Sequence, residues 1–443
     1  NKPDLVDFYK MEINPQNSNE YLLDGQWTAF ETKTATMLVK LFGPIRWTFE
    51  KEIKISQHGP VMETDHGLYA ARWAGMENVR TLESMFIMNK ATNKQEFEAG
   101  LKLNAMPSIN FVYADKEGNI AHYYNAMFPD RIEGWQWDKI LPGDKSELIW
   151  QGYRDFSMMP KTVNPVSGLV YNANNPPFMA TDGDDDAQAK DYPASMGIES
   201  YVTNRAYQIE DLFKGSTHIT KKLLREVKYD VSYHKDSNQI QHLNEWLKLD
   251  LSAELNTQEK QALLSLREWD FSTHMDNQQA ALAILTLDPV QKAWSKPVEL
   301  ALITEAFKQT VAVLIEHHGT VSVPYGDVMR LIHGDKNLAI SGGPDTMRAV
   351  YGKELNQDGQ AMNKAGDGFL MFVSWDRDGL VNSDAIHQFG SATLDESSPH
   401  FNDQMEMFVN HQERKVLFER KDLEKSMERR YQPGKPKLVA IQE

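Results

Sequence analysis

The order of hydrophobic patterns along the chain constrains its fold more than any single motif does. Residues 1 to about 135 favour strands, and 109–114 and 119–124 flank a turn with glycine at position 118, which predicts a hairpin. Between residues 82 and 103 the apolar residues recur near helical spacing and predict one or two helices. The first part of the chain is therefore predicted to form a sheet with a few helices.

The middle and the end of the chain have different patterns. Residues 129–200 are rich in proline, glycine and asparagine, and long loops of this kind inside a compact domain are usually functional. From residue 203 to about 332, apolar residues recur at three- and four-residue steps, which predicts helices with Thr220 and Thr257 as N-caps. Strand character returns over 366–390, and 413–430 predicts a last surface helix.

This order predicts an α+β fold in which a sheet takes strands from both ends of the chain and the helices form an inserted or flanking lobe. The predicted parts are a β-rich part at 1–202, a mainly helical lobe at 203–365, and returning strands with a C-terminal helix at 366–443.

Composition narrows the chemistry that the chain can perform. The 443 residues include no cysteine, which removes disulfides, thiolate metal sites and a cysteine nucleophile. The net charge of −16 argues against a nucleic-acid or anionic-membrane partner, because basic side chains are not in excess. No stretch approaches about 18 uninterrupted apolar residues, so no membrane span is predicted. Any nucleophile must therefore be an oxygen or a nitrogen.

Three asparagines in four positions, Asn172, Asn174 and Asn175, follow a short apolar segment at 169–171 that is predicted to be a strand. Buried amides need several hydrogen-bond partners and are costly when unpaired. Two interpretations are open at this point. The segment is either an asparagine-rich turn or a fixed side-chain amide whose N–H groups point into a cleft and stabilise an oxyanion.

A series of short motifs, each weak alone but retained in order, resembles the penicillin acylase family of N-terminal nucleophile hydrolases. The resemblance runs from about residue 4 to residue 434. Its segment at 342–345 is more similar to the acyl-homoserine-lactone and aculeacin acylase branch than to the penicillin G branch. The motifs are His58-Gly59-Pro60, Phe111-Val112-Tyr113-Ala114-Asp115, Pro129-Asp130-Arg131, Trp150-x-Gly152, Asn164-Pro165, Asn172-Ala173-Asn174-Asn175-x-Pro177, Asp191-Tyr192-Pro193-Ala194-Ser195, Gly342-Gly343-Pro344-Asp345 and His400-Phe401-Asn402-Asp403-Gln404.

The resemblance implies an αββα sandwich with a mainly helical lobe, and a precursor that cuts itself into two chains. In this family the large chain begins with a serine whose hydroxyl attacks an amide carbonyl while its own α-amine takes the proton. An α-amino group has a pKa of about 7.7–8.0, so a useful fraction is a neutral base near neutral pH. One residue thus supplies both nucleophile and base.

Two site residues follow from the resemblance. Asn174 falls on the family's oxyanion-hole asparagine. Arg205 falls on the arginine that holds this region and the amino terminus in place electrostatically. The alternative for Arg205 is an ordinary arginine on the surface of a helix.

A structural calcium ion is also implied, because Asp4, Val6 and Asp7 match the family's calcium-binding stretch. Two carboxylates and a backbone carbonyl are hard oxygen ligands suited to Ca²⁺. The alternative is a solvated acidic edge. Met196 stands where family members with calcium have an aspartate, and Glu199 is a candidate substitute.

The front of the chain departs from the family, because position 1 is asparagine and the match begins after the nucleophilic serine. We expect a fragment of the large (β) chain that needs the missing N-terminal segment and the small (α) chain for turnover. The expected function is an amide hydrolase that removes an acyl chain from an antibiotic or an N-acyl-homoserine lactone. The alternative is a catalytically inactive relative that binds a ligand or has a structural role. The resemblance also implies export to the periplasm.

Overall fold

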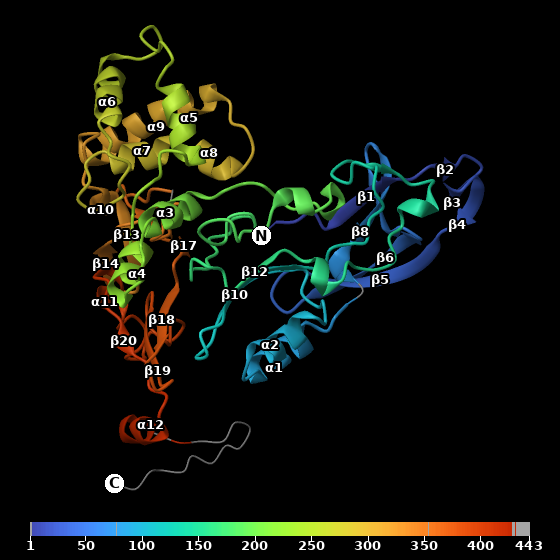
Figure 1. Ribbon diagram of the computed structural model, residues 1–443. Coiled ribbons are helices and arrows are strands. Elements are labelled where there is room, and N and C mark those ends of the chain that lie inside the picture. Colours follow the sequence, from blue (N-terminus) through green and yellow to red (C-terminus); the bar gives the residue numbers. More distant parts are fainter. Residues whose placement is uncertain (1, 77, 353, 428–429, 431–443) are drawn as a thin grey trace. The chain divides into compact units, whose positions relative to one another are not determined.

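The computed structural model describes residues 2–76, 78–352, 354–427 and 430. The chain divides into two compact units, Asn1–Val202 (unit 1) and Thr203–Glu443 (unit 2). Each unit has its own hydrophobic core, and both contain strands and helices (Figure 1).

Unit 1 is built mainly from strands. Its largest sheet has the order β11-β1-β8-β7-β6-β5, and two three-stranded sheets have the orders β12-β10-β9 and β2-β3-β4. Neighbouring strands of the large sheet are antiparallel, except that β1 and β11 are parallel. The strands are β1 (Val6–Lys10), β2 (Ile13–Asn14), β3 (Asn17–Leu23), β4 (Gln26–Ala29), β5 (Glu31–Lys40), β6 (Arg46–Ser56), β7 (Gly59–Thr64), β8 (Gly67–Trp73), β9 (Ser108–Ala114), β10 (Ile120–Ala126), β11 (Leu141–Pro142) and β12 (Lys161–Val163).

The predicted hairpin is confirmed, because β9 and β10 pair in antiparallel register from Ser108–Ala126 to Ala114–Ile120. The Asp115 carboxylate accepts hydrogen bonds from the backbone N–H groups of Glu117 and Asn119, both at 3.0 Å. Gly118 takes a φ of 87°. Such turns are local, because an aspartate side chain bonds the backbone that follows it and glycine permits positive φ.

Of two other local predictions about unit 1, one is confirmed and one is wrong. Two helices, α1 (Thr81–Lys90) and α2 (Lys94–Leu101), occupy the segment predicted to be helical. The apolar segment at 169–171 is not a strand and lies in a loop, where the Tyr171 backbone N–H donates to the Ala180 carbonyl at 2.9 Å. A single backbone bond of this kind does not extend into a ladder, so the segment's apolar side chains pack without forming part of a sheet.

The described part of unit 2 contains ten α-helices, and its core includes Trp246 and Phe307, whose ring centroids lie 5.2 Å apart. No helix in the described part of the chain is both long and apolar enough to cross a bilayer. The helices are α3 (Asn204–Phe213), α4 (Lys221–Lys228), α5 (Asn238–Trp246), α6 (Thr257–Arg267), α7 (Ala280–Thr286), α8 (Asp288–Ala293), α9 (Leu300–His318), α10 (Tyr325–Val328), α11 (Met405–Val409) and α12 (Arg420–Ser426).

The sheets of unit 2 are small. Their orders are β14-β13-β16, β15-β17 and β18-β19-β20, and the antiparallel β18–β19 pair forms the predicted returning strands. The strands are β13 (Met329–His333), β14 (Lys336–Ala339), β15 (Val350–Tyr351), β16 (Ala361–Met362), β17 (Ala365–Gly366), β18 (Phe369–Trp375), β19 (Val381–His387) and β20 (Arg414–Lys415).

The predicted ends of three helices in unit 2 can be compared with the ends that the structure shows. Thr220 caps α4 as predicted, because its side chain accepts the Leu223 N–H. The cap of α6 is Asn256 rather than Thr257, since Asn256 forms a reciprocal capping box with Glu259. The helix α12 is shorter than the predicted 413–430, and of that range residues 428–429 lie outside the described part.

Candidate active site

The asparagine-rich loop of unit 1 is held by its two flanking asparagines. The Asn172 side-chain oxygen accepts the Asn174 backbone N–H at 3.0 Å, and its Nδ2 donates to the Asn175 carbonyl at 3.3 Å. The fully buried Asn175 accepts the Ala173 N–H at 2.7 Å and donates to the carbonyls of Pro176 and Met179. All of these bonds join residues of the loop to one another, so the loop is held by its own side chains and backbone.

Asn174 occupies the one exposed asparagine position of this loop, with a φ of 63°. Asparagine is among the residues that tolerate the left-handed region best, because its short polar side chain bonds locally. The turn interpretation is confirmed for Asn172 and Asn175, and Asn174 is the asparagine that this turn leaves exposed. The role of Asn174 as an oxyanion donor stays a prediction.

A histidine that the sequence analysis missed lies beneath this loop. His122 on β10 is fully buried, and its Nε2 lies 3.2 Å from Asn110 Oδ1 and 3.5 Å from Asn172 Nδ2. Burial lowers the pKa of His122 to about 4, so the ring is neutral near pH 7. In the neutral ring, Nε2 either donates to Asn110 or accepts from Asn172, so His122 bonds one of the two asparagines and lies against the other. The local pattern gives no sign of this role, because β10 is buried along most of its length.

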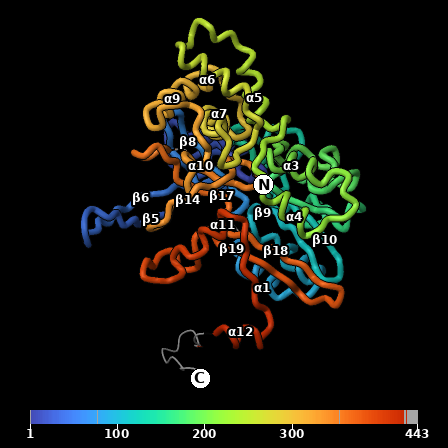
Figure 2. Tube along the Cα trace, turned by 90° about the vertical axis from the view of Figure 1, so that its left-hand side faces the viewer, coloured from blue at the N-terminus to red at the C-terminus, as the bar shows by residue number. Residues whose placement is uncertain are grey.

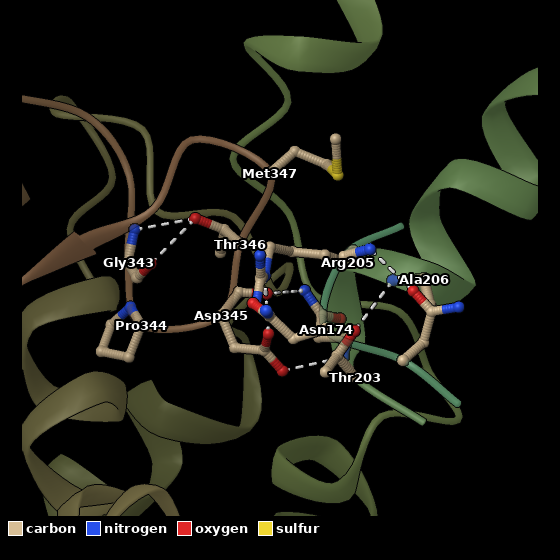
Figure 3. Close-up of polar contacts among 12 residues, drawn as sticks. Asn174, Thr203, Arg205, Ala206, Gly343, Pro344, Asp345, Thr346 and Met347 are labelled. Atoms are coloured by element: carbon tan, nitrogen blue, oxygen red, sulfur yellow. Dashed lines mark hydrogen bonds and ion pairs between the residues drawn. The ribbon is translucent and has the colours of Figure 1, made fainter. Parts of the chain in front are cut away.

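Arg205, in unit 2, lies in the first turn of α3 and pairs with Asp345 (Figure 3). Its Nε donates to Asp345 Oδ1 at 2.9 Å, while the Asn204 backbone N–H donates to Asp345 Oδ2 at 2.8 Å. The arginine side chain is 18% exposed and Asp345 is buried. Burial raises the pKa of Asp345 although the Arg205 charge opposes that rise. Arg205 is therefore a largely buried, anchored cation rather than an ordinary surface arginine.

The motif at 342–345 builds the anchor of Arg205. Gly342 takes a φ of 116°, and a Cβ there would lie 2.3 Å from the Arg348 carbonyl oxygen, so the position requires glycine. The Gly343 N–H donates to Thr346 Oγ1 at 2.9 Å (Figure 3). The Asp345 N–H donates to the Tyr351 hydroxyl at 3.1 Å. The glycines therefore allow a tight turn that buries the Asp345 carboxylate.

The predicted calcium stretch forms a buried ion cluster in unit 1. Arg131 Nη2 lies 2.9 Å from Asp7 Oδ1, and Arg131 Nη1 lies 3.7 Å from Asp4 Oδ2. Arg131 also donates to the Ser195 carbonyl at 3.2 Å, and Trp150 Nε1 donates to Asp7 Oδ2 at 2.7 Å. The Asp7 carboxylate is therefore surrounded by protein donors, and the cluster is not a solvated acidic edge.

These residues do not by themselves fit a calcium ion. Calcium takes six to eight oxygen ligands, whereas the predicted set offers two carboxylates and the Val6 carbonyl beside a guanidinium. The described residues contain no group of three or more histidine, aspartate or glutamate side chains that could hold a metal. Met196 is fully buried, and Glu199 accepts the Lys2 N–H at 2.6 Å and the Tyr124 hydroxyl. Calcium binding thus stays a prediction that requires ligands from elsewhere.

Comparisons with known proteins agree with the resemblance. The family model described as penicillin amidase matches residues 1–425, so the chain belongs to that family. Penicillin G acylase of Escherichia coli is 31% identical over 197 residues, which are 43% of this chain and 21% of that protein. The acyl-homoserine lactone acylase PvdQ of Pseudomonas fluorescens is 21% identical over 461 aligned residues, covering 91% of this chain and 58% of that protein. The chain therefore spans less than two thirds of the length of these relatives.

A solved structure supports the fold. The thermostable penicillin G acylase from Alcaligenes faecalis matches with a TM-score of 0.63 at 20% identity, over 100% of this chain and 87% of that one. The expected α+β fold of the N-terminal nucleophile hydrolases is thereby confirmed.

Proposed function

We propose that the complete protein is an acylase that hydrolyses an amide bond to an acyl chain. One observation carries the proposal: Asn174 stands exposed at a positive φ on a loop that its neighbours hold rigid. Membership of the penicillin amidase family supports it. A preorganised amide donor costs no reorganisation when negative charge develops on the carbonyl oxygen.

The proposed mechanism places the nucleophile in a serine outside this chain, at the amino terminus of the mature large chain. The serine oxygen attacks the substrate carbonyl carbon while its α-amine takes the hydroxyl proton. The Asn174 side chain donates an N–H to the oxyanion. When the intermediate collapses, the carbon–nitrogen bond breaks and the leaving amine receives the proton. Water then hydrolyses the acyl-enzyme in the same way.

Arg205 has a positioning role in this proposal. Its charge is fixed by Asp345 at one end of α3, and it steadies the neighbourhood of the amino terminus, as the family resemblance implies. The acyl pocket is proposed to be completed by the small (α) chain and the missing N-terminal segment. Export to the periplasm is proposed on the family resemblance alone.

The substrate class is proposed from the relatives. One relative is named a penicillin G acylase and another an acyl-homoserine lactone acylase. We propose an acylated antibiotic or an N-acyl-homoserine lactone as substrate for the complete protein, with release of the free acid.

The test measures acid release by the complete protein from penicillin G and from N-acyl-homoserine lactones. Asn174→Ala is expected to lower kcat on the order of 10²–10³-fold, because one oxyanion donor is lost. Asn174→Gly is expected to have the same effect. Glycine adopts positive φ without strain, so equal losses in both variants assign the effect to the amide rather than to the backbone.

Asn164→Ala is the matched control, since Asn164 is also exposed and has a φ of 49°. Its side chain bonds the Ile120 N–H of the β9–β10 hairpin, and kcat should stay within about twofold in a folded variant. A complete protein without acylase activity on either substrate class would favour the inactive, ligand-binding alternative. A change in KM alone for Asn174→Ala would contradict the oxyanion role.

A further inference from the structure

The hairpin formed by β5 and β6 extends beyond the sheet of unit 1. The two strands pair through ten residue pairs, from Glu31–Ile55 to Lys40–Arg46, whereas β6 pairs with β7 only at Ile55 and Ser56. β5 is the edge strand of the sheet. Most of the hairpin is therefore a two-stranded ribbon that runs past its neighbours (Figure 2). An isolated two-stranded ribbon is marginally stable in water.

The hairpin tip, residues 37–49, has one exposed apolar face that continues into an apolar loop. Successive residues of a strand point to opposite faces, and residues directly opposite each other share a face. The register therefore places Met37, Val39, Trp47 and Phe49 on one face, and Leu38, Lys40, Arg46 and Thr48 on the other. In the loop, Leu41 is 56% exposed and Phe42 is 69% exposed. A contiguous exposed apolar surface of this kind marks a protein or membrane interaction site.

The charge of the tip differs from the charge of the chain. Lys40 and Arg46 lie directly opposite each other, and residues 37–49 contain no aspartate or glutamate. The paired stretch 46–54 places them roughly 30 Å from the sheet, at about 3.3 Å per residue. Salt screens exposed charges beyond about 8–10 Å. The net charge of −16 therefore has little influence at the tip, where the two cations decide the sign.

We propose that the hairpin tip inserts into the interface of an anionic lipid bilayer. Leu41 and Phe42, in the loop at the tip, enter the region below the headgroups, and Trp47 lies at headgroup level, where amphipathic aromatic rings are enriched. Lys40 and Arg46 contact lipid phosphates. The proposal departs from the expectation based on the overall charge, because the ribbon holds the tip away from the acidic bulk of the chain. The proposal is independent of the acylase activity.

The test is co-sedimentation of the complete protein with vesicles of phosphatidylglycerol and phosphatidylethanolamine, compared with vesicles of phosphatidylcholine alone. Leu41→Ser and Phe42→Ser are each expected to lower the partition coefficient by about tenfold, the factor that corresponds to losing one buried apolar side chain. Lys40→Gln and Arg46→Gln are each expected to lower it by about fivefold on the anionic vesicles only. Leu394→Ser is the matched control, because Leu394 in unit 2 is 99% exposed, and partition should not change.

A second measurement detects directly whether the hairpin tip enters the bilayer. The sequence has no cysteine, so Phe42→Cys gives one position in this chain for an environment-sensitive fluorophore, with Leu394→Cys as control. Anionic vesicles should shift the emission of the first label to the blue and leave the second unchanged. Absence of binding, or a label at position 42 already shielded in the complete protein without vesicles, would overturn the proposal. Self-association that Phe42→Ser abolishes would overturn it in favour of a second copy of the chain.

Discussion

Each unit contains a buried ion cluster, and the two clusters have opposite charge balance. In unit 1, Arg131 is shared by Asp4 and Asp7, so one cation faces two carboxylates. In unit 2, Asp367 is shared by Lys228 at 2.7 Å and Arg348 at 3.3 Å, so one carboxylate faces two cations. Arg131 and Arg348 are both fully buried.

The pKa values shift in opposite directions because burial disfavours the charged form of each group, which raises the pKa of an acid and lowers the pKa of a base. Burial raises the pKa of Asp7 against the opposing charge of Arg131, and it raises the pKa of Asp4 in the same way. Burial lowers the pKa of Lys228, and that of Arg348, against the opposing charge of Asp367. We therefore expect the loss of a buried arginine to lower the free energy of unfolding most where that arginine is the only cation of its cluster.

The largest effect is expected for Arg131→Met. Removing the only cation leaves the Asp7 carboxylate buried without a counter-charge, which should lower the free energy of unfolding by about 3–5 kcal/mol. Urea unfolding of the complete protein measures it. The control is Arg80→Met, because the Arg80–Glu83 pair is half exposed and should contribute at most about 1 kcal/mol. Equal losses in the two variants would refute the role of burial.

A histidine in each unit allows a second comparison, this time against pH. Burial lowers the pKa of His122 and of His411 to about 4 from the ordinary 6.5. The unfolded histidine therefore takes a proton at a higher pH than the folded one, so stability is full above pH 6.5 and falls as the pH drops toward 4. In the described residues, the His122 Nδ1 has no hydrogen-bond partner to receive a second proton.

His122→Gln should remove the contribution of one of these histidines. Lowering the pH from 7 to 4 should therefore lower the unfolding free energy of the parent protein by roughly 3 kcal/mol more than that of the variant, at about 1.4 kcal/mol per unit of pKa shift. Urea unfolding across this pH range measures it. A difference that is independent of pH would show that folding does not change the pKa of His122.

The smallest effect of the three is expected for Arg348→Met. Lys228 still neutralises Asp367, so only the charged hydrogen bonds of Arg348 are lost, including that to the Phe408 carbonyl at 2.9 Å. The free energy of unfolding should fall by about 1.5–3 kcal/mol. A loss as large as that of Arg131→Met would break the comparison and show that charge balance does not set the sensitivity of these clusters.

Much of the fold could be predicted because its signals are local. The β9–β10 turn is closed by Asp115 and Gly118, and the cap of α4 is Thr220, each within four residues of the group it bonds. The long β5–β6 hairpin was not predicted as a unit. Residues 37–39 and 41–42 are apolar in succession, and such runs interrupt the alternation from which half-buried strands are inferred.

The candidate site also combines contacts between residues close in sequence with contacts between residues far apart in sequence. The printed bonds that shape the loop around Asn174 come from residues within four positions, and the catalytic role that the resemblance gives Asn174 stays a prediction. Arg205 is held by Asp345, 140 residues away, and Asp7 by Arg131, 124 residues away. No spacing rule connects such pairs, so the metal-like stretch at Asp4–Asp7 could not be recognised from sequence as one half of an ion pair.

The sequence by itself determined the family, the order of strands and helices, and the turn-forming chemistry of the asparagine loop, because hydrophobic periodicity and side-chain bonds to nearby backbone act over a few residues. Tertiary structure alone decided which charges were buried together, that Arg131 faces Asp7, and that His122 lies against the asparagine loop. Burial decides these because the free energy of a charge depends on its whole surroundings, and those surroundings come from segments more than a hundred residues apart.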